Sequence, residues 1–161
     1  MFALNIHRCK HCSTPALQWD ASLAAQAQSR ADSCPASRAA PSGLTDAVEV
    51  VSFLQVPIRT ESFFNWNAVV TTWHSSGNAY NFDTGHGGGF LGDFFPLVWD
   101  TTTHVGCGYN PSCSNALPTG ALHLTAVCRF SPAPEGQSTA HVFPLAQSSS
   151  CSQSPSCQMT G

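Results

Sequence analysis

Eight cysteines among 161 residues restrict the folds open to this chain more than any other feature. An even number of closely spaced cysteines is typical of proteins that fold in an oxidising compartment. A chain of this length buries about 68–70% of its unfolded surface, so it does not need cross-links merely to fold. We therefore predict an extracellular protein with one domain, residues 1–145, and a Ser- and Cys-rich tail, residues 146–161. Because no signal peptide follows Met1, we expect the sequence to be a mature or truncated form.

Charge and apolar content exclude several classes of protein. Charged residues make up only 9% of the chain, and the formal net charge is −3. Nucleic-acid binding needs a basic stripe, and no run of Lys or Arg occurs. Low charge together with ten Phe and four Trp is typical of a globular domain rather than a disordered one. No window reaches the roughly 20 apolar residues that cross a membrane. We therefore expect no nucleic-acid partner and no integral membrane span.

The stretch from Gly92 to Cys107 predicts a strand, a polar corner and a second strand. Residues 94–99 form a run of aromatic and β-branched residues, which is typical of a buried strand. Asp100 and three threonines then turn the chain back toward Cys107. Asp93 precedes the first strand, where it is a candidate active-site acid.

The rest of the chain predicts helices first and strands later. Residues 1–12 read as a short helical turn. Residues 15–34 predict a helix, with Asp20 as a candidate N-cap, because Trp19, Leu23 and Ala27 recur every four residues. We expect a second helix at 60–75, loops at 35–43, 83–92 and 109–120, and a strand at 121–130. This order predicts an α+β fold with helices packed around a central sheet.

Several sequence motifs follow one another in a fixed order. They read L-Q-W-D-A-S-L-A-A-Q-A at 17–27, Y-N-F at 80–82, G-D-F-F-P-L-V-W at 92–99, H-V-G-C-G at 104–108 and A-V-C-R-F-S-P at 126–132. Together they resemble motifs of the CAP superfamily, which comprises cysteine-rich secretory proteins, antigen 5 and pathogenesis-related protein 1. The resemblance covers roughly residues 4–137 and implies a three-layer α-β-α sandwich.

The resemblance also implies a cleft with two His and two Glu, which bind zinc in some members of the family. Carried over one position at a time, this set becomes His7, Glu49, Ser76 and Asp93. His7, Glu49 and Asp93 remain candidate ligands for zinc or for a harder cation. The favoured interpretation is instead that Asp93 and His7 form a hydrogen-bonded pair that closes the cleft, without a resident cofactor.

Catalysis is an alternative that we do not favour. A serine hydrolase would use Ser76 as nucleophile, His7 as base and Glu49 or Asp93 to orient the base. The H-G-G-G run at 86–89 resembles an oxyanion-hole motif of esterases, but the chain has no G-x-S-x-G nucleophile elbow. His86 is an alternative occupant of the cleft. We predict no catalytic residues.

The cysteines can pair in many ways that spacing does not decide. The resemblance implies the disulfides Cys107–Cys128 and Cys34–Cys113. The other four cysteines would join the termini in an open pairing: Cys9, Cys12, Cys151 and Cys157. A zinc knuckle at 9–12 is the less favoured alternative.

The predicted function is therefore that of a secreted, non-catalytic binding or interaction module. The resemblance implies a sterol or a fatty acid as ligand, or a role in defence; a glycan or another protein is an alternative ligand. The apolar run at 50–58 either lines a lipid pocket or, as we favour, packs in the core. A structural protein of the cell wall or extracellular matrix is a third interpretation.

Overall fold

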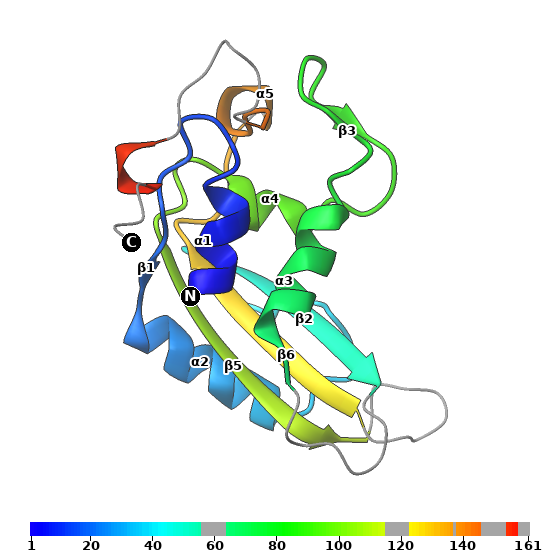
Figure 1. The fold of residues 1–161 in the computed structure, drawn as a ribbon. Coiled ribbons are helices and arrows are strands. Elements are labelled where there is room, and N and C mark those ends of the chain that lie inside the picture. The colour runs from blue at the N-terminus through cyan, green and yellow to red at the C-terminus, as the bar shows by residue number, and fades with distance from the viewer. Residues whose placement is uncertain (56–63, 115–122, 137, 146–153, 158–161) are drawn as a thin grey trace.

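The computed structural model describes residues 1–55, 64–114, 123–136, 138–145 and 154–157 (Figure 1). Its elements are, in chain order, α1 (Phe2–Arg8), β1 (Gln18–Trp19), α2 (Ala21–Asp32), β2 (Val48–Gln55), α3 (Trp66–Ser75), β3 (Tyr80–Asn81), β4 (His86–Gly87), α4 (Phe94–Val98), β5 (His104–Cys113), β6 (His123–Ser131), α5 (Ser138–His141) and the 3-10 turn η2 (Pro155–Cys157). None of the helices in these ranges is long and apolar enough to cross a membrane.

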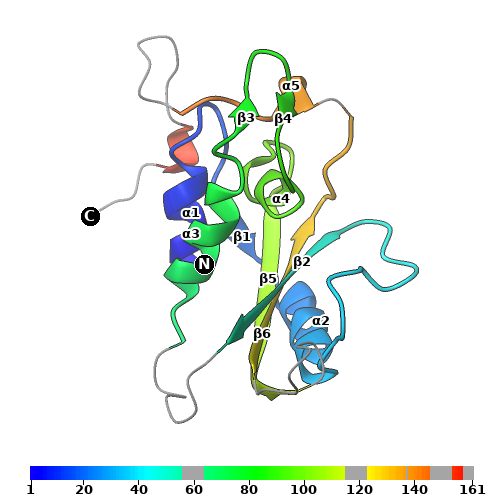
Figure 2. The same cartoon turned by 90° about the vertical axis from the view of Figure 1, so that its right-hand side faces the viewer.

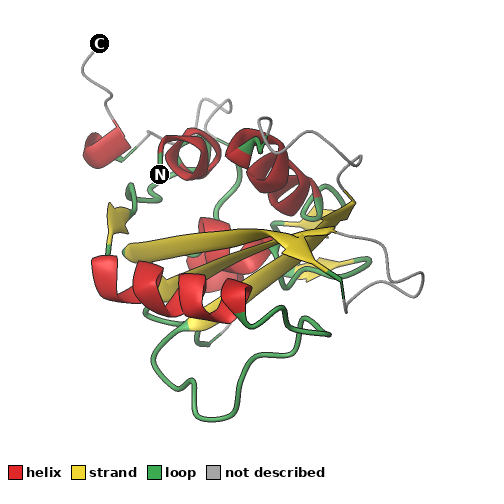
Figure 3. Ribbon diagram, turned by 90° about the horizontal axis from the view of Figure 1, so that it is seen from below, coloured by secondary structure: helices red, strands yellow, loops and turns green. Residues whose placement is uncertain are grey.

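A four-stranded sheet lies between two layers of helices. Its strand order is β1-β5-β6-β2; β6 runs antiparallel to both of its neighbours, and β1 runs parallel to β5. Helix α2 covers one face, and α1, α3 and α4 cover the other (Figures 2 and 3). The three-layer α-β-α sandwich that the resemblance implied is therefore confirmed.

Alternation along β2 shows how the sheet supplies two separate cores. Val50 belongs to the larger apolar cluster, which includes Val70 and Trp73 of α3. Val51, one residue later, packs with Ala27 of α2. Successive side chains of a strand point to opposite faces, so odd and even positions of β2 meet different helices. The central strand β6 is buried from His123 to Phe130, because both of its faces are covered.

The prediction of a strand at 94–99 is wrong, because most of this stretch is the short helix α4. A brief apolar run buried on all sides has no periodicity that separates strand from helix. Pro96 is compatible with the helix, because it lies in the first turn, where its missing N–H costs no hydrogen bond. Phe94, Leu97 and Val98 are all buried in the larger apolar cluster.

Other element boundaries also differ from the sequence-based prediction. Trp19 lies in β1, and α2 begins at Ala21; Asp20 is the N-cap, and its carboxylate accepts hydrogen bonds from the N–H groups of Ser22 and Leu23. The expected loop at 109–120 begins inside β5, which continues to Cys113. The expected loop at 83–92 contains β4, paired with β3. Helix α3 begins at Trp66, and residues 60–63 lie outside the described residues.

Two glycines of the V-G-C-G segment let α2 lie directly on β5. A Cβ atom at Gly106 would overlap the backbone of Ala24, and one at Gly108 would overlap the backbone of Gln28. The side chain of Gln28 fixes the contact: its amide donates to the carbonyl of Tyr109 (2.9 Å) and its oxygen accepts from the Tyr109 N–H (3.1 Å). The motif therefore encodes a helix–strand contact that admits no side chain.

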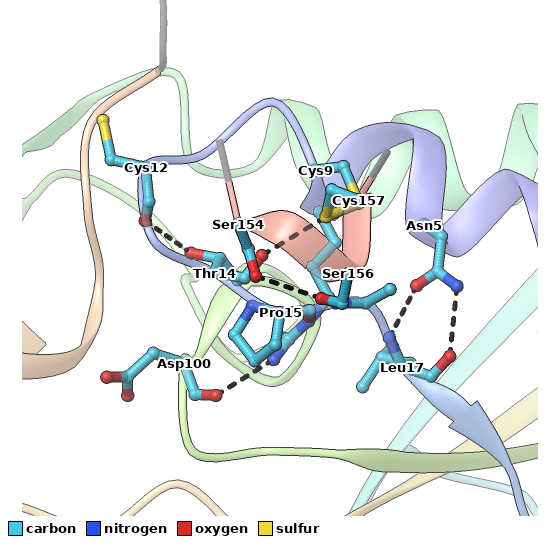
Figure 4. The surroundings of a disulfide bond; sticks show 12 residues. Asn5, Cys9, Cys12, Thr14, Pro15, Leu17, Asp100, Ser154, Ser156 and Cys157 are labelled. Carbon is cyan, nitrogen blue, oxygen red and sulfur yellow. Dashed lines mark hydrogen bonds between the residues drawn. A yellow bond between two sulfur atoms is a disulfide. The ribbon is translucent and has the colours of Figure 1, made fainter. Parts of the chain in front are cut away.

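Disulfides join distant parts of the chain. Both bonds that the resemblance implied are present: Cys107–Cys128 links β5 to β6, and Cys34–Cys113 links the end of α2 to the end of β5. Cys9 pairs with Cys157, which ties the segment after α1 to η2 (Figure 4). None of the cysteines in the described ranges is free, which does not fit a zinc knuckle at 9–12.

Candidate functional site

His7 lies on the buried face of α1 and points toward α3. Its Nε2 is 3.0 Å from the hydroxyl oxygen of Thr71, and its ring centre is 4.8 Å from that of His74. Its Nδ1 is buried and has no hydrogen-bond partner among the described residues. The predicted pair between His7 and Asp93 is therefore wrong, because His7 contacts α3 instead.

Glu49 faces the opposite side of the sheet from α1. It is an odd-numbered residue of β2, like Val51, and therefore points toward α2. Its buried carboxylate pairs with Arg30 at 3.1 Å and with Arg129 at 2.9 Å. Two cations already satisfy this carboxylate, so it fits a structural ion-pair network better than a metal site.

Asp93 pairs with Arg38 across 3.0 Å. Burial raises the pKa of the Asp93 carboxyl, and the charge and hydrogen bond of Arg38 act in the opposite direction. Arg38 was not predicted as a site residue, although it is the only charged residue in the Ala-, Ser- and Pro-rich segment 35–43.

Ser76 is the C-cap residue of α3. Its hydroxyl donates to the carbonyl of Trp73 at 2.7 Å. His86 is exposed on β4, with Nδ1 2.6 Å from the carbonyl of Thr84. The structure thus does not assemble the Ser76–His7 pair that a hydrolase would need, nor does it place His86 in a cleft.

The candidate zinc ligands do not fit zinc in this arrangement. Glu49 lies on the α2 face of the sheet, His7 lies on the α1 face, and Asp93 is paired with Arg38. Across the part of the chain that the structure describes, no three His, Cys, Asp or Glu side chains are grouped so as to hold a metal ion.

A histidine cluster that the sequence analysis did not identify lies between α1 and α3. It consists of His7, His11 and His74. Nε2 of His11 is 2.9 Å from Nε2 of His74, and Nδ1 of His11 is 2.6 Å from the carbonyl oxygen of Phe143. The i, i+4 spacing of His7 and His11 was a visible signal. The sequence did not indicate which face of the helix that carries His74 would pack against them.

All three rings of the histidine cluster favour the neutral form. Desolvation by burial is the main cause in each case, and it lowers the pKa of His7, His11 and His74 below the ordinary value of 6.5. The pKa of His74 falls furthest, to about 4, because the charges of His11, His7 and Lys10 add to burial.

An apolar cavity of about 170 Å³ lies between α1, α3 and β5. Its lining is mostly apolar and aromatic: Met1, Ala3, Leu4, Trp19, Gln28, Trp66, Val70, Cys107, Gly108 and Tyr109. Trp19 and Tyr109 are 45% and 42% exposed, so part of this wall faces solvent. Phe64 stacks on Tyr109 with ring centres 4.5 Å apart, which extends the aromatic surface.

The described part of the apolar run, residues 50–55, does not line this cavity. Val50 and Val51 are each 1% exposed and pack in the two cores. Residues 56–58 lie outside the described residues. For the described part of the run, the favoured interpretation as core packing is therefore confirmed.

Comparisons with known proteins agree with this fold. The family model of the cysteine-rich secretory proteins (CAP) matches residues 1–130. A probable pathogenesis-related protein of Arthroderma benhamiae is 30% identical over 80% of this chain, which spans only 41% of that relative's length. Venom allergen-like protein 4 of Schistosoma mansoni superposes with a TM-score of 0.63 at 19% identity, covering 89% of this chain and 92% of that one. Na-ASP-1 superposes with a TM-score of 0.64 at 15% identity, covering 94% and 42%.

Proposed function

Because this chain belongs to the CAP family of cysteine-rich secretory proteins, we propose that it is a secreted module that binds an apolar lipid chain and catalyses no reaction. The observation that carries the proposal is the cavity between α1, α3 and β5. Its walls offer aliphatic and aromatic carbon, and the hydrophobic effect rewards the removal of such surface from water.

The size of the cavity limits what can enter. An apolar protein cavity of about 150 Å³ accepts a benzene molecule. A cavity of about 170 Å³ therefore accepts one ring or a short length of alkyl chain, but not a whole lipid. The rest of the ligand would lie across the exposed rings of Trp19 and Tyr109. A fatty acid or the alkyl tail of a sterol fits this description better than a glycan, which needs many polar partners.

The absence of catalysis is part of the proposal. The serine hydrolase considered above needs the Ser76 hydroxyl within hydrogen-bond reach of a base. The Ser76 hydroxyl instead donates to a backbone carbonyl, and the carboxylates of Glu49 and Asp93 are bound to arginines. These contacts support a binding module over a hydrolase.

Secretion and a defence-related role are inferred from the disulfides and from a relative rather than from the cavity. Disulfides persist in oxidising compartments, and none of the described cysteines is free. The Arthroderma benhamiae relative is itself named a probable pathogenesis-related protein. We extend both properties to this chain as part of the proposal.

Filling the cavity tests the proposed function. The variant Ala3→Trp places an indole in the cavity wall on α1, so we expect about tenfold or greater loss of affinity for a dansyl-labelled fatty acid. The matched control is Ala140→Trp, since Ala140 is exposed on α5, a helix that contributes no residue to the cavity lining. Affinity is measured by dansyl fluorescence titration. Equal affinities of the two variants and the unaltered chain would contradict binding in this cavity.

A further inference from the structure

The histidine cluster lies along the contact between α1 and α3. Helix α1 supplies His7, the segment after it supplies His11, and α3 supplies His74. The rings are packed together: His7 and His74 are 4.8 Å apart at their centres, and His11 and His74 are 5.2 Å apart. Phe94 of α4 contacts the rings of His11 and His74, each at 5.8 Å, and closes that side of the cluster with carbon.

The hydrogen bond between His11 and His74 needs one of the two facing Nε2 atoms to lack a proton. A carbonyl oxygen only accepts, so Nδ1 of His11 must donate to Phe143. In the neutral ring, Nε2 of His11 then carries a lone pair and accepts from Nε2–H of His74, 2.9 Å away. Once Nε2 of both His11 and His74 carries a proton, two N–H groups face each other at this distance. The bond that joins the two histidines would then become a repulsion.

Nothing charged around the cluster offsets an added proton. The charged groups that act on the three rings within the described residues are Arg8 and Lys10, and both are cations. The carboxylate of Asp93, at the start of α4, pairs with Arg38. The Asp100 carboxylate, after α4, pairs with His141. On the segment at 142–145, His11 meets the carbonyl of Phe143, which carries no charge.

The same helix contact forms the wall of the apolar cavity. Ala3 and His7 are four residues apart on α1, and Val70 and His74 are four residues apart on α3, so each pair shares a face of its helix. Ala3 and Val70 line the cavity. Figure 2 shows α1 and α3 side by side over the sheet. The cluster therefore lies one helical turn from the cavity, along the same interface.

We propose that His7, His11 and His74 form an acid-sensitive latch that holds α1 against α3, and that protonation of the latch opens the cavity and releases its ligand. The latch itself needs no ligand. The release of a ligand rests on the function proposed above.

The lowered pKa values of the three histidines predict that acid lowers the stability of the α1–α3 contact. The three histidines bind protons less well in the fold than in the unfolded chain, whose ordinary pKa is 6.5. Between about pH 6.5 and about pH 4, the unfolded or opened state therefore holds more protons, and stability falls as the pH falls. Above this window, all three rings are neutral in both states and the latch is closed. The raised pKa of Asp93 changes stability in the opposite direction. The overall stability therefore does not isolate the histidines, and the test must measure opening at α1 and α3 themselves.

Hydrogen–deuterium exchange of the ligand-free protein tests the latch directly. Exchange rates are compared across the window after correction for the intrinsic pH dependence of exchange. We expect acid to speed exchange in α1 and α3 by about tenfold or more, while β5 and β6 stay protected. Uniform protection of α1 and α3 across the window would overturn the proposal.

Variants assign the effect to the cluster. His11→Gln with His74→Gln removes two titrating rings but keeps hydrogen-bonding side chains, so acid should no longer speed exchange selectively in α1 and α3. The control His86→Gln alters an exposed histidine of β4 and should behave like the unaltered chain. If the double variant opens in acid as the unaltered chain does, the latch lies elsewhere. If the double variant does not fold, NMR titration of the unaltered chain decides: the cluster rings must titrate below the ordinary histidine pKa of 6.5.

A ligand arm separates the two proposals. Dansyl-labelled fatty acid bound at neutral pH should be released in acid by the unaltered chain and retained by the double variant. Binding that does not change with pH, with selective exchange also absent, would overturn the latch but not the proposed function. An absence of binding at every pH, with selective exchange present, would overturn the proposed function but support the latch.

Discussion

At the scale of single residues, buried polar groups organise this protein more than any catalytic group does. Arg8 is 0% exposed, and burial lowers its pKa to about 9. Its guanidinium donates to four backbone carbonyls, those of Pro15, Leu97, Asp100 and Thr102. The planar fork of five N–H groups suits such a set of acceptors, and no other side chain replaces it. Arg8 thus connects α1, α4 and the polar corner that follows.

Substitution of Arg8 should be costly even when charge is kept. Arg8→Lys cannot reach four divergent carbonyls, so it leaves buried acceptors unpaired and should lower the free energy of unfolding by roughly 3 kcal/mol. The control Arg38→Lys alters a half-exposed ion pair and should cost about 0–1 kcal/mol. Urea denaturation of both variants measures the difference. Equal midpoints for the two variants would contradict a central role for Arg8.

Residue types alone could not locate the site. The sequence indicated that Glu49 and Asp93 were candidate acids, but both are bound by arginines. Glu49 was misplaced because a shift of one residue moves a strand side chain to the other face of a sheet. The position of Asp93 depends on Arg38, which is 55 residues away in the chain. No local pattern reports such a contact.

At the scale of elements, local signals predicted helices better than short apolar runs. The Asp20 N-cap was visible, because an acid before a periodic apolar face is a local signal. Helix α4 was not recognised, because four of its five residues are buried and it shows no polar face. The sequence therefore indicated where elements begin more reliably than which short buried runs are strands.

The contact of α2 with β5 yields a sharp prediction. Gly106→Ala places a methyl group against the backbone of α2, which cannot give way as a flexible side chain would, so it should cost about 3 kcal/mol. Gly88→Ala is the control, because a Cβ atom there meets no atom within 4 Å. Thermal unfolding followed by circular dichroism compares the two. A neutral Gly106→Ala would show that the helix can move away from the strand.

At the scale of the whole molecule, disulfides join distant segments of a chain that is long enough to fold without them. The motif order predicted the sandwich, and the family resemblance implied the pairs Cys34–Cys113 and Cys107–Cys128; of these four cysteines, only Cys107 and Cys128 lie inside the motifs themselves. The partner of Cys9 stayed open, since its pairing depends on a terminal segment outside every motif. The division into a domain at 1–145 and a tail at 146–161 stays a prediction.

The disulfide Cys9–Cys157 should stabilise the fold more than the disulfide Cys107–Cys128 does, because it closes a much longer loop. It spans 148 residues, so the chain-entropy model gives on the order of 5 kcal/mol for its closure. The bond Cys107–Cys128 spans 21 residues and should give on the order of 3 kcal/mol. Paired Cys→Ser variants of each bond, compared by denaturant unfolding, test this order. A larger loss from the shorter loop would contradict the entropic account.

The central claim is that an apolar chain enters the cavity between α1 and α3. The most direct measurement is the detection of intermolecular NOEs between a bound fatty acid and the methyl groups of the protein. The claim predicts NOEs from the acyl chain to Leu4 and Val70, which both line the cavity. NOEs confined to methyl groups elsewhere, or none from a saturated complex, would contradict it.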